Sequence, residues 1–162
     1  MLLFVLRHAE AEPLSPSGLD ADRALTEAGR KRMKAVARAI ARMEPGFDAV
    51  LVSPLRRARE TAEAVTDACR FEGEPRVTES LLPGSDPELL LDELAGVDGT
   101  ATLVVGHEPH LGRLVGRLVS GRKDVEVPMK KAGLAVFELH RQLGADRAEL
   151  KSYLPPRLLE RL

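Results

Sequence analysis

Leu2-Leu3-Phe4-Val5-Leu6-Arg7-His8 begins the chain, directly after Met1, with five apolar residues followed at once by a cation and an imidazole. A short apolar run bounded by polar residues is typical of a strand that is buried on both faces of a parallel sheet. Ligand sites of open α/β sheets lie just beyond the carboxyl ends of such strands. We therefore expect Arg7 and His8 to lie at a functional edge of a sheet.

Length and composition predict a globular protein of ordinary type. The 162 residues suit one domain, which we place over residues 1–162. With a net charge of −1, the chain lacks the excess positive charge that favours binding to nucleic acid or to an anionic membrane, so we expect neither as a partner. The apolar start is too short for a signal peptide, and no run reaches the ~18 residues of a membrane span. With a single cysteine, Cys69, expected to be buried, we predict a cytoplasmic protein.

The remainder of the chain alternates predicted helices and strands. Apolar residues at helical spacing, such as Met33, Val36 and Ile40, and capping residues such as Thr26 indicate the helices. This alternation predicts an α/β fold, a three-layer α/β/α sandwich with a mostly parallel central sheet. The predicted helices lie between 26 and 45, 54 and 69, 85 and 94, and 109 and 118, with a helical turn after 156; the predicted strands cover 47–52, 76–78, 100–105, 134–139 and 148–153, with a short extended piece at 125–127.

Three of the predicted strands end in polar residues. Because the carboxyl ends of parallel strands share one sheet edge, these residues can converge, and two of the strands lead into helix N-termini, which favour anions. Guanidinium groups match phosphate oxygens, so imidazoles and guanidiniums together suit a phosphoryl group better than a metal ion. The residues are Arg7 and His8 after the first strand, Ser53 with Arg56, Arg57 and Arg59 after the second, and His107 after the strand at 100–105.

Each of these residues also has a structural interpretation when it is taken alone. A histidine after a strand is often structural, and an arginine cluster is usually a solvated helix face. The stretch His107-Glu108-Pro109-His110 has the wrong spacing for the helical zinc motif His-Glu-x-x-His, so we expect no metal and no cofactor. His110 and His140 are interpreted as packing or surface residues. The coincidence of three polar strand ends favours a functional site.

Four motifs occur in one order along the chain: Leu6-Arg7-His8-Ala9-Glu10-Ala11, then residues 20–29 (DADRALTEAG), residues 53–62 (SPLRRARETA) and Val105-Gly106-His107-Glu108-Pro109. Together they resemble the histidine phosphatase superfamily, which has the phosphoglycerate-mutase-like fold. The branch that they resemble most is the SixA-type phosphohistidine phosphatases. The resemblance covers the chain from residue 3 to about residue 118.

The resemblance implies a role for each matched residue. His8 matches the nucleophilic histidine, and Arg7 matches the phosphate-binding arginine beside it. Arg57, rather than its neighbours, matches the second phosphate-binding arginine, and His107 matches the second histidine. Glu60 stands where the family has glutamine. The implied reaction proceeds through a phosphohistidine on the enzyme, with no metal ion.

The general acid is the least defined part of the implied mechanism. Many members of the superfamily protonate an alkoxide leaving group with a carboxylic acid. Glu79 is the nearest candidate by order, Glu108 is a second, and Arg23 either lines the substrate groove or anchors its loop. A phosphohistidine substrate needs less protonation, because imidazole leaves more readily than an alkoxide. In the larger mutases of the superfamily, insertions in the region between Glu79 and Thr100 close over small substrates, so the resemblance implies that this chain, whose segment is short, has an open groove that admits a protein surface.

The leading hypothesis is a metal-independent phosphatase that removes phosphate from phosphohistidine in proteins, such as a histidine phosphotransfer domain, and releases inorganic phosphate. A phosphatase for small-molecule phosphoesters is the alternative enzyme. A non-catalytic phosphoprotein-binding module is less favoured, because every expected catalytic position is filled. A nucleic-acid-associated protein is disfavoured, since the basic residues of the first helix are interpreted as a solvated face.

Overall fold

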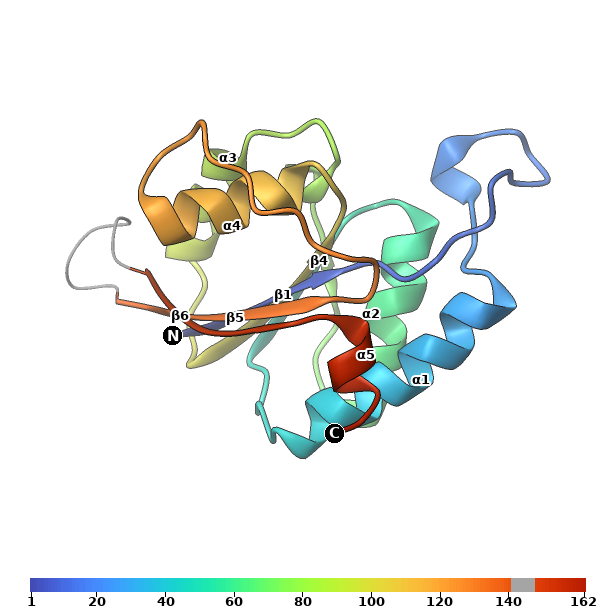
Figure 1. Ribbon diagram of the computed structural model, residues 1–162, viewed down its shortest axis with the longest axis horizontal. Coiled ribbons are helices and arrows are strands. Elements are labelled where there is room, and N and C mark those ends of the chain that lie inside the picture. The colour runs from blue at the N-terminus through green and yellow to red at the C-terminus, as the bar shows by residue number, and fades with distance from the viewer. Residues whose placement is uncertain (141–147) are drawn as a thin grey trace.

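The computed structural model describes residues 1–140 and 148–162 and has a six-stranded sheet between two layers of helices (Figure 1). The strands are β1 (Leu2–Arg7), β2 (Ala49–Val52), β3 (Arg76–Val77), β4 (Ala101–Gly106), β5 (Leu134–Leu139) and β6 (Ala148–Leu154). The helices are α1 (Glu27–Arg42), α2 (Arg56–Cys69), α3 (Pro87–Ala95), α4 (His110–Ser120) and α5 (Pro156–Leu159), with 3-10 turns η1 (Asp20–Asp22) and η2 (Glu79–Leu81).

The strands follow the order β3-β2-β4-β1-β5-β6 across the sheet. The four strands from β3 to β1 are parallel to one another, whereas β5 is antiparallel to β1 and to β6. The sheet is therefore mostly parallel with an antiparallel edge, and the predicted fold class is confirmed.

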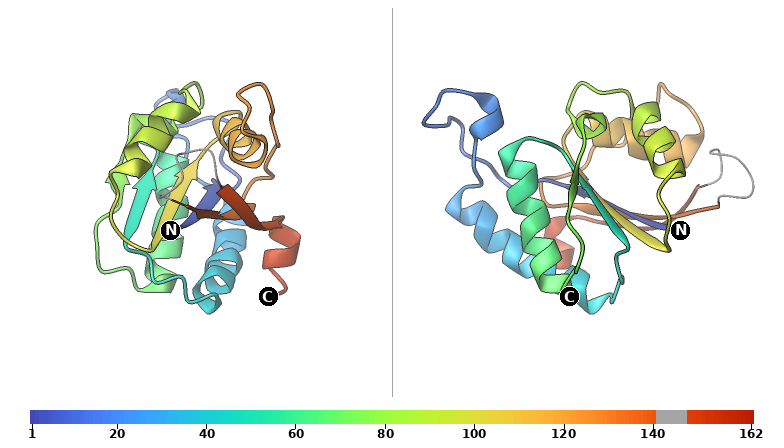
Figure 2. Two further views of the ribbon diagram at one scale, coloured as in Figure 1. Left: turned by 90° about the vertical axis from the view of Figure 1, so that its left-hand side faces the viewer. Right: turned by 180° about the vertical axis from the view of Figure 1, so that it is seen from behind.

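Two apolar cores lie on the two faces of the sheet. Phe4 and Leu6 of β1 pack into the core that is shared with α1, α2 and α5. Leu3 and Val5 of the same strand pack into the core that is shared with α3 and α4. Figures 1 and 2 show these helix layers on opposite sides of the sheet. Because both faces of β1 are covered, its sequence is a continuous apolar run rather than an alternating one.

The strand register brings the chemistry-bearing residues to one edge of the sheet. Arg7 is the register partner of Gly106, and Val52 is the register partner of Val105. The residues that follow these partners therefore emerge side by side. This edge is the one at which the sequence places its polar strand ends.

The first helix is fixed tightly against the segment that follows β1. The Thr26 side chain caps α1 by accepting a hydrogen bond from the Gly29 backbone nitrogen at 2.9 Å. A Cβ atom at Gly29 would lie 2.2 Å from the Glu10 carbonyl oxygen, so only glycine allows this approach. The N-terminus of α1 is thus held against the chain directly after His8.

The short extended piece expected at 125–127 joins no strand of the sheet, and two short elements were not predicted. The segment 125–127 is not a strand; its Val127 nitrogen donates to the Gly112 carbonyl of α4 at 2.9 Å. A Cβ atom at Gly116 would lie 1.9 Å from the Val125 carbonyl oxygen, so the segment packs on α4 instead of pairing with the sheet. The turns η1 and η2 are the additions. None of the helices described here is long and apolar enough to cross a membrane.

Candidate active site

The imidazoles of His8 and His107 lie side by side beyond the ends of β1 and β4. Their ring centroids are 4.8 Å apart and the ring planes are inclined by 51°. Each histidine follows one member of the Arg7–Gly106 register pair, so the parallel pairing of the two strands places them together. Both side chains are buried.

Arg57 is the arginine of its cluster that is turned inward. It lies on the buried face of α2 together with Thr61 and Val65, one and two helical turns further on. Its side chain is 7% exposed, whereas that of Arg56 is 49% exposed and pairs with Glu60. Arg57 is therefore the buried arginine of this cluster, and its positive charge acts on both imidazoles.

In the Arg7 guanidinium, Nη1 has a hydrogen-bond partner within the protein and Nε has none among the described residues. Its Nη1 donates to the Met129 carbonyl oxygen at 2.5 Å. Its Nε is buried and has no hydrogen-bond partner within residues 1–140 and 148–162. Burial lowers the pKa of the guanidinium, and the nearby Glu108 carboxylate opposes that effect. A buried N–H donor without a protein acceptor suits an anionic ligand.

His8 has a defined tautomer. Its Nδ1 lies 2.6 Å from the Ala9 carbonyl oxygen, which can only accept, so Nδ1 carries the ring proton. The lone pair is therefore on Nε2. Burial lowers the pKa of His8 to about 4, and the positive charges of Arg57 and Arg7 add to the effect. The ring is neutral at physiological pH, which is the state that a nucleophilic imidazole requires.

His107 is held by a serine from the neighbouring strand end. Its Nε2 lies 2.7 Å from Ser53 Oγ. Burial lowers the pKa of His107 to about 3, with His8 and Arg57 adding to the effect, so this ring is also neutral. Its Nδ1 is buried and has no partner among the residues that the structure describes.

The loop between β1 and α1 reaches back to Arg57 through Asp20. Arg57 donates from Nη1 to the Asp20 carbonyl at 2.9 Å and from Nη2 to its carboxylate at 3.1 Å. Arg23 donates from Nη1 to the other carboxylate oxygen at 2.7 Å and from Nε to the Glu12 carbonyl at 2.6 Å. Burial acts to raise the pKa of Asp20, but hydrogen bonds from Arg23 and Arg57 lower it overall.

These contacts show what the sequence prediction omitted. Asp20 was not singled out, although it begins one of the motifs, because its contact with Arg57 depends on the path of a loop. Of the two interpretations of Arg23, its contacts favour a loop anchor, since its bonds go to Asp20 and Glu12 within the same loop. Figure 1 shows this loop extending beyond the helix layers.

Neither of the two carboxylates considered as general acids forms a hydrogen bond with His8 or His107 among the described residues. Glu79 begins η2 with an exposed side chain, and no hydrogen bond or ion pair among the described residues joins that side chain to the site. Glu108 is half-buried and accepts from the Met129 nitrogen at 2.8 Å. Glu108 therefore helps to fix Met129, the residue whose carbonyl oxygen accepts from Arg7.

Three side chains of the kinds that bind metal ions lie close together near β5 and β6. Ligand atoms of Glu138, His140 and Glu149 lie within 4.8 Å of one another. The Lys151 ammonium is 3.0 Å from Glu138 and 3.1 Å from Glu149, so a lysine already balances both carboxylates.

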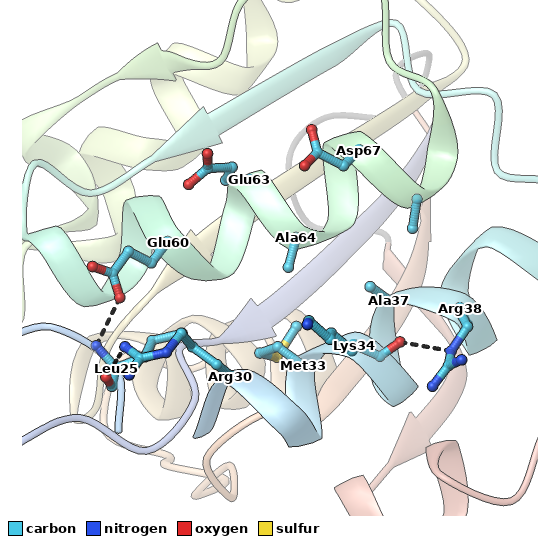
Figure 3. Close-up of a pocket in the computed structure, with 11 residues that line it drawn as sticks. Leu25, Arg30, Met33, Lys34, Ala37, Arg38, Glu60, Glu63, Ala64 and Asp67 are labelled. Carbon is cyan, nitrogen blue, oxygen red and sulfur yellow. Dashed lines mark hydrogen bonds between the residues drawn. The ribbon is translucent and has the colours of Figure 1, made fainter. Parts of the chain in front are cut away.

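A groove of about 680 Å³ runs between α1 and α2. Figure 3 shows it with Arg30, Lys34 and Arg38 on α1 and with Glu60 on α2. Its lining includes none of the two histidines and two arginines described above. The candidate site is therefore the strand-end cluster and not this groove.

The strand-end cluster offers the donors that a tetrahedral anion needs. It combines a free imidazole lone pair with two guanidiniums and a second neutral imidazole. Such donors stabilise negative charge on equatorial phosphoryl oxygens, and the lone pair supplies a nucleophile.

Known proteins match both the sequence and the fold. The sequence model of the histidine phosphatase superfamily (branch 1) matches residues 3–82. Phosphohistidine phosphatase SixA of Escherichia coli K12 is 32% identical over 124 residues, which are 75% of this chain and 76% of that protein. An uncharacterized protein of Picosynechococcus is 34% identical over 137 residues, covering 83% of this chain and 82% of the relative. The structure of protein histidine phosphatase SixA complexed with tungstate superposes with a TM-score of 0.85 at 26% identity, covering 97% of this chain and 98% of that chain.

Proposed function

Because the chain belongs to the histidine phosphatase superfamily and is a phosphatase, we propose that it dephosphorylates phosphohistidine in proteins through a phosphorylated His8 and without a metal ion. The observation that carries this proposal is the state of His8. Its Nδ1 proton is engaged by Ala9, its Nε2 lone pair is free, and its ring adjoins His107. We assign the activity to one domain, residues 1–162, and to the cytoplasm.

In the first step, the His8 Nε2 lone pair attacks phosphorus in line with the leaving group. The new P–N bond forms as the bond from phosphorus to the substrate imidazole breaks, and the departing nitrogen takes its electron pair and then a proton from solvent. Arg7, Arg57 and His107 stabilise the equatorial oxygens. The two guanidiniums supply the positive charge that Mg²⁺ supplies in many phosphoryl transfers.

In the second step, water attacks the phosphorylated His8. The P–N bond breaks, Nε2 regains its lone pair, and inorganic phosphate leaves. Splitting the transfer in this way replaces one difficult displacement by two easier ones.

Two features support phosphohistidine over an alkyl phosphoester as the substrate. The side chain of the proposed acid Glu79 is exposed and has no hydrogen bond or ion pair with the site among the described residues, and an imidazole leaving group depends least on an acid. In addition, Leu90 and Leu94 of α3 pack into the core, so the helix between η2 and β4 covers the sheet rather than the site. A site that α3 does not cover suits a protein-borne phosphoryl group.

A comparison of substrates tests the proposal. The wild-type protein and His8→Ala would each be assayed in the presence of EDTA. The substrates are a phosphorylated histidine phosphotransfer domain and a panel of sugar phosphates and nucleotides. We expect the phosphodomain to be turned over by the wild type alone and faster than any panel member. Rapid turnover of the panel with the phosphodomain untouched would identify a phosphoesterase. Binding of the phosphodomain without turnover would identify a binding module.

A further inference from the structure

Ser53 is fixed beside His107 by the strand pairing. It is the first residue after β2 and is fully buried. Its backbone nitrogen donates to the Val105 carbonyl of β4 at 3.1 Å, two residues before His107. Its hydroxyl oxygen then lies 2.7 Å from His107 Nε2. The sequence predicts Ser53 at this sheet edge but indicates no hydrogen-bond partner for its hydroxyl.

The proton on the Ser53 hydroxyl has one acceptor in reach among the described residues. The Leu55 N–H already donates to Ser53 Oγ at 3.4 Å, so the hydroxyl oxygen acts as an acceptor there. A buried hydroxyl proton needs an acceptor of its own, and His107 Nε2 provides it. If Nε2 carried the ring proton instead, the Ser53 proton and the His107 Nδ1 lone pair would both be left unpaired.

This arrangement places the ring proton of His107 on Nδ1. That atom is buried and has no acceptor in residues 1–140 and 148–162. An N–H group buried without an acceptor is costly, unless a ligand supplies the missing oxygen. The ring that carries it lies 4.8 Å from the His8 ring, where the proposed phosphoryl group must be.

We propose that Ser53 is a positioning residue that holds His107 as its neutral Nδ1–H tautomer, so that this N–H donates to a phosphoryl oxygen beside His8. The proposal rests on the proposed function, because it assumes a phosphoryl group at His8. The two rings then have complementary roles, since His8 presents a lone pair to phosphorus and His107 presents a proton to oxygen. In the opposite tautomer, a nitrogen lone pair would face an anionic oxygen.

Long-range ¹H–¹⁵N NMR correlations of the histidine rings read the tautomer directly and need no substrate. In the wild-type protein near neutral pH, we expect the His107 proton on Nδ1. In Ser53→Ala we expect the Nε2–H form to appear, and in Ser53→Thr, which keeps a hydroxyl, the Nδ1–H form to persist. Ser80→Ala is the matched control, because the Ser80 hydroxyl bonds to Thr78 and Glu93 instead.

Kinetics on the phosphodomain supply the second readout. Ser53→Ala should lower kcat, by less than the ~10²- to 10³-fold loss that follows removal of an oxyanion donor outright. Ser53→Thr should recover part of that loss, and Ser80→Ala should match the wild type. A wild-type protein with its His107 proton on Nε2 overturns the proposal even if Ser53→Ala fails to fold. A wild type without phosphatase activity but with the Nδ1–H tautomer overturns the proposed function and leaves the tautomer assignment standing.

Discussion

Burial determines the protonation state of the two histidines at the site. The pKa is about 4 for His8 and about 3 for His107, against an ordinary value of 6.5. Sequence motifs identify both residues, but burial depends on how helices cover the sheet edge. The tautomers depend in turn on Ala9 and Ser53, whose contacts with the two rings were not predicted.

The first prediction is a pH profile without an inflection at the ordinary histidine pKa. Since free His8 is neutral above about pH 4, kcat/KM should stay level as the pH falls toward about 5 and should drop only as the pH approaches 4. The measurement is kcat/KM against pH, corrected for the ionisation of the substrate phosphoryl group. An enzyme inflection near 6.5 would contradict the assignment of a buried, neutral nucleophile.

His110 provides a separate test, of stability rather than activity. It is fully buried at the start of α4, and burial, with Arg113 adding to the effect, lowers its pKa to about 4. The unfolded chain therefore binds the extra proton between about pH 6.5 and 4, so this group makes the free energy of unfolding fall as the pH falls through that window. Neither ring nitrogen has a hydrogen-bond partner in the described parts of the chain.

The second prediction is that His110→Leu removes this dependence. We would measure the free energy of unfolding of both proteins by urea titration near pH 7.5 and near pH 5. The packing change shifts the variant by the same amount at both pH values. The difference, variant minus wild type, should therefore be more favourable to the variant near pH 5 than near pH 7.5. A difference between the two proteins that is the same at both pH values would contradict the prediction.

At the scale of secondary-structure elements, the β1–α1 loop is joined to α2 by the Asp20–Arg57 contact. The third prediction is that Asp20→Ala lowers kcat/KM by up to about fivefold, because the contact positions Arg57 but solvent screens the 61% exposed Asp20 carboxylate to about 1 kcal/mol or less. Asp20→Asn, which keeps an acceptor, should lose less. Asp22→Ala is the control, since that carboxylate in the same turn accepts from Ser17. Equal losses in the Asp20→Ala and Asp22→Ala variants would show that the turn matters only as structure.

Glu60 links α2 to the chain before α1. One carboxylate oxygen accepts from the Leu25 nitrogen at 2.8 Å, and the other pairs with Arg56 at 2.7 Å. Glutamine, the family residue, keeps an acceptor for Leu25 and loses only a largely exposed ion pair. The glutamate is therefore compatible with the same loop path.

The fourth prediction follows from these two contacts. Glu60→Gln should change the free energy of unfolding by no more than about 1 kcal/mol, as is usual for an exposed ion pair. Glu60→Ala leaves the Leu25 N–H without its acceptor and should cost about 1–3 kcal/mol. Urea titrations of the three proteins test this difference, and equal destabilisation by both substitutions would contradict it.

The elements that the sequence predicted well are those with a local signal. Apolar periodicity and the cap at Thr26 define α1, and continuous apolar runs define β1 and β4. The segment 125–127 carries an extended-looking pattern, but its partner is α4, which approaches because Gly112 and Gly116 lack side chains. No property of the segment itself reveals that partner.

At the scale of the whole molecule, alternating strands and helices were enough to predict a mostly parallel sheet with both faces covered. They did not reveal that β5 would be antiparallel to β1 and to β6, because alternation of elements does not specify which strands become neighbours. The site itself is a product of topology. The register between β1 and β4 places His8 beside His107, and the buried face of α2 carries Arg57.

The central claim is that His8 carries the phosphoryl group during turnover. Its most direct test is alkaline quenching of a single turnover with a phosphorylated phosphotransfer domain, followed by mass spectrometry of the enzyme peptides. The wild type and His110→Leu should both show a transient, acid-labile phosphoryl group on His8, and His8→Ala should show none. Turnover by His8→Ala, or a wild-type enzyme that turns over with no phosphorylated His8 at any time, would contradict the account.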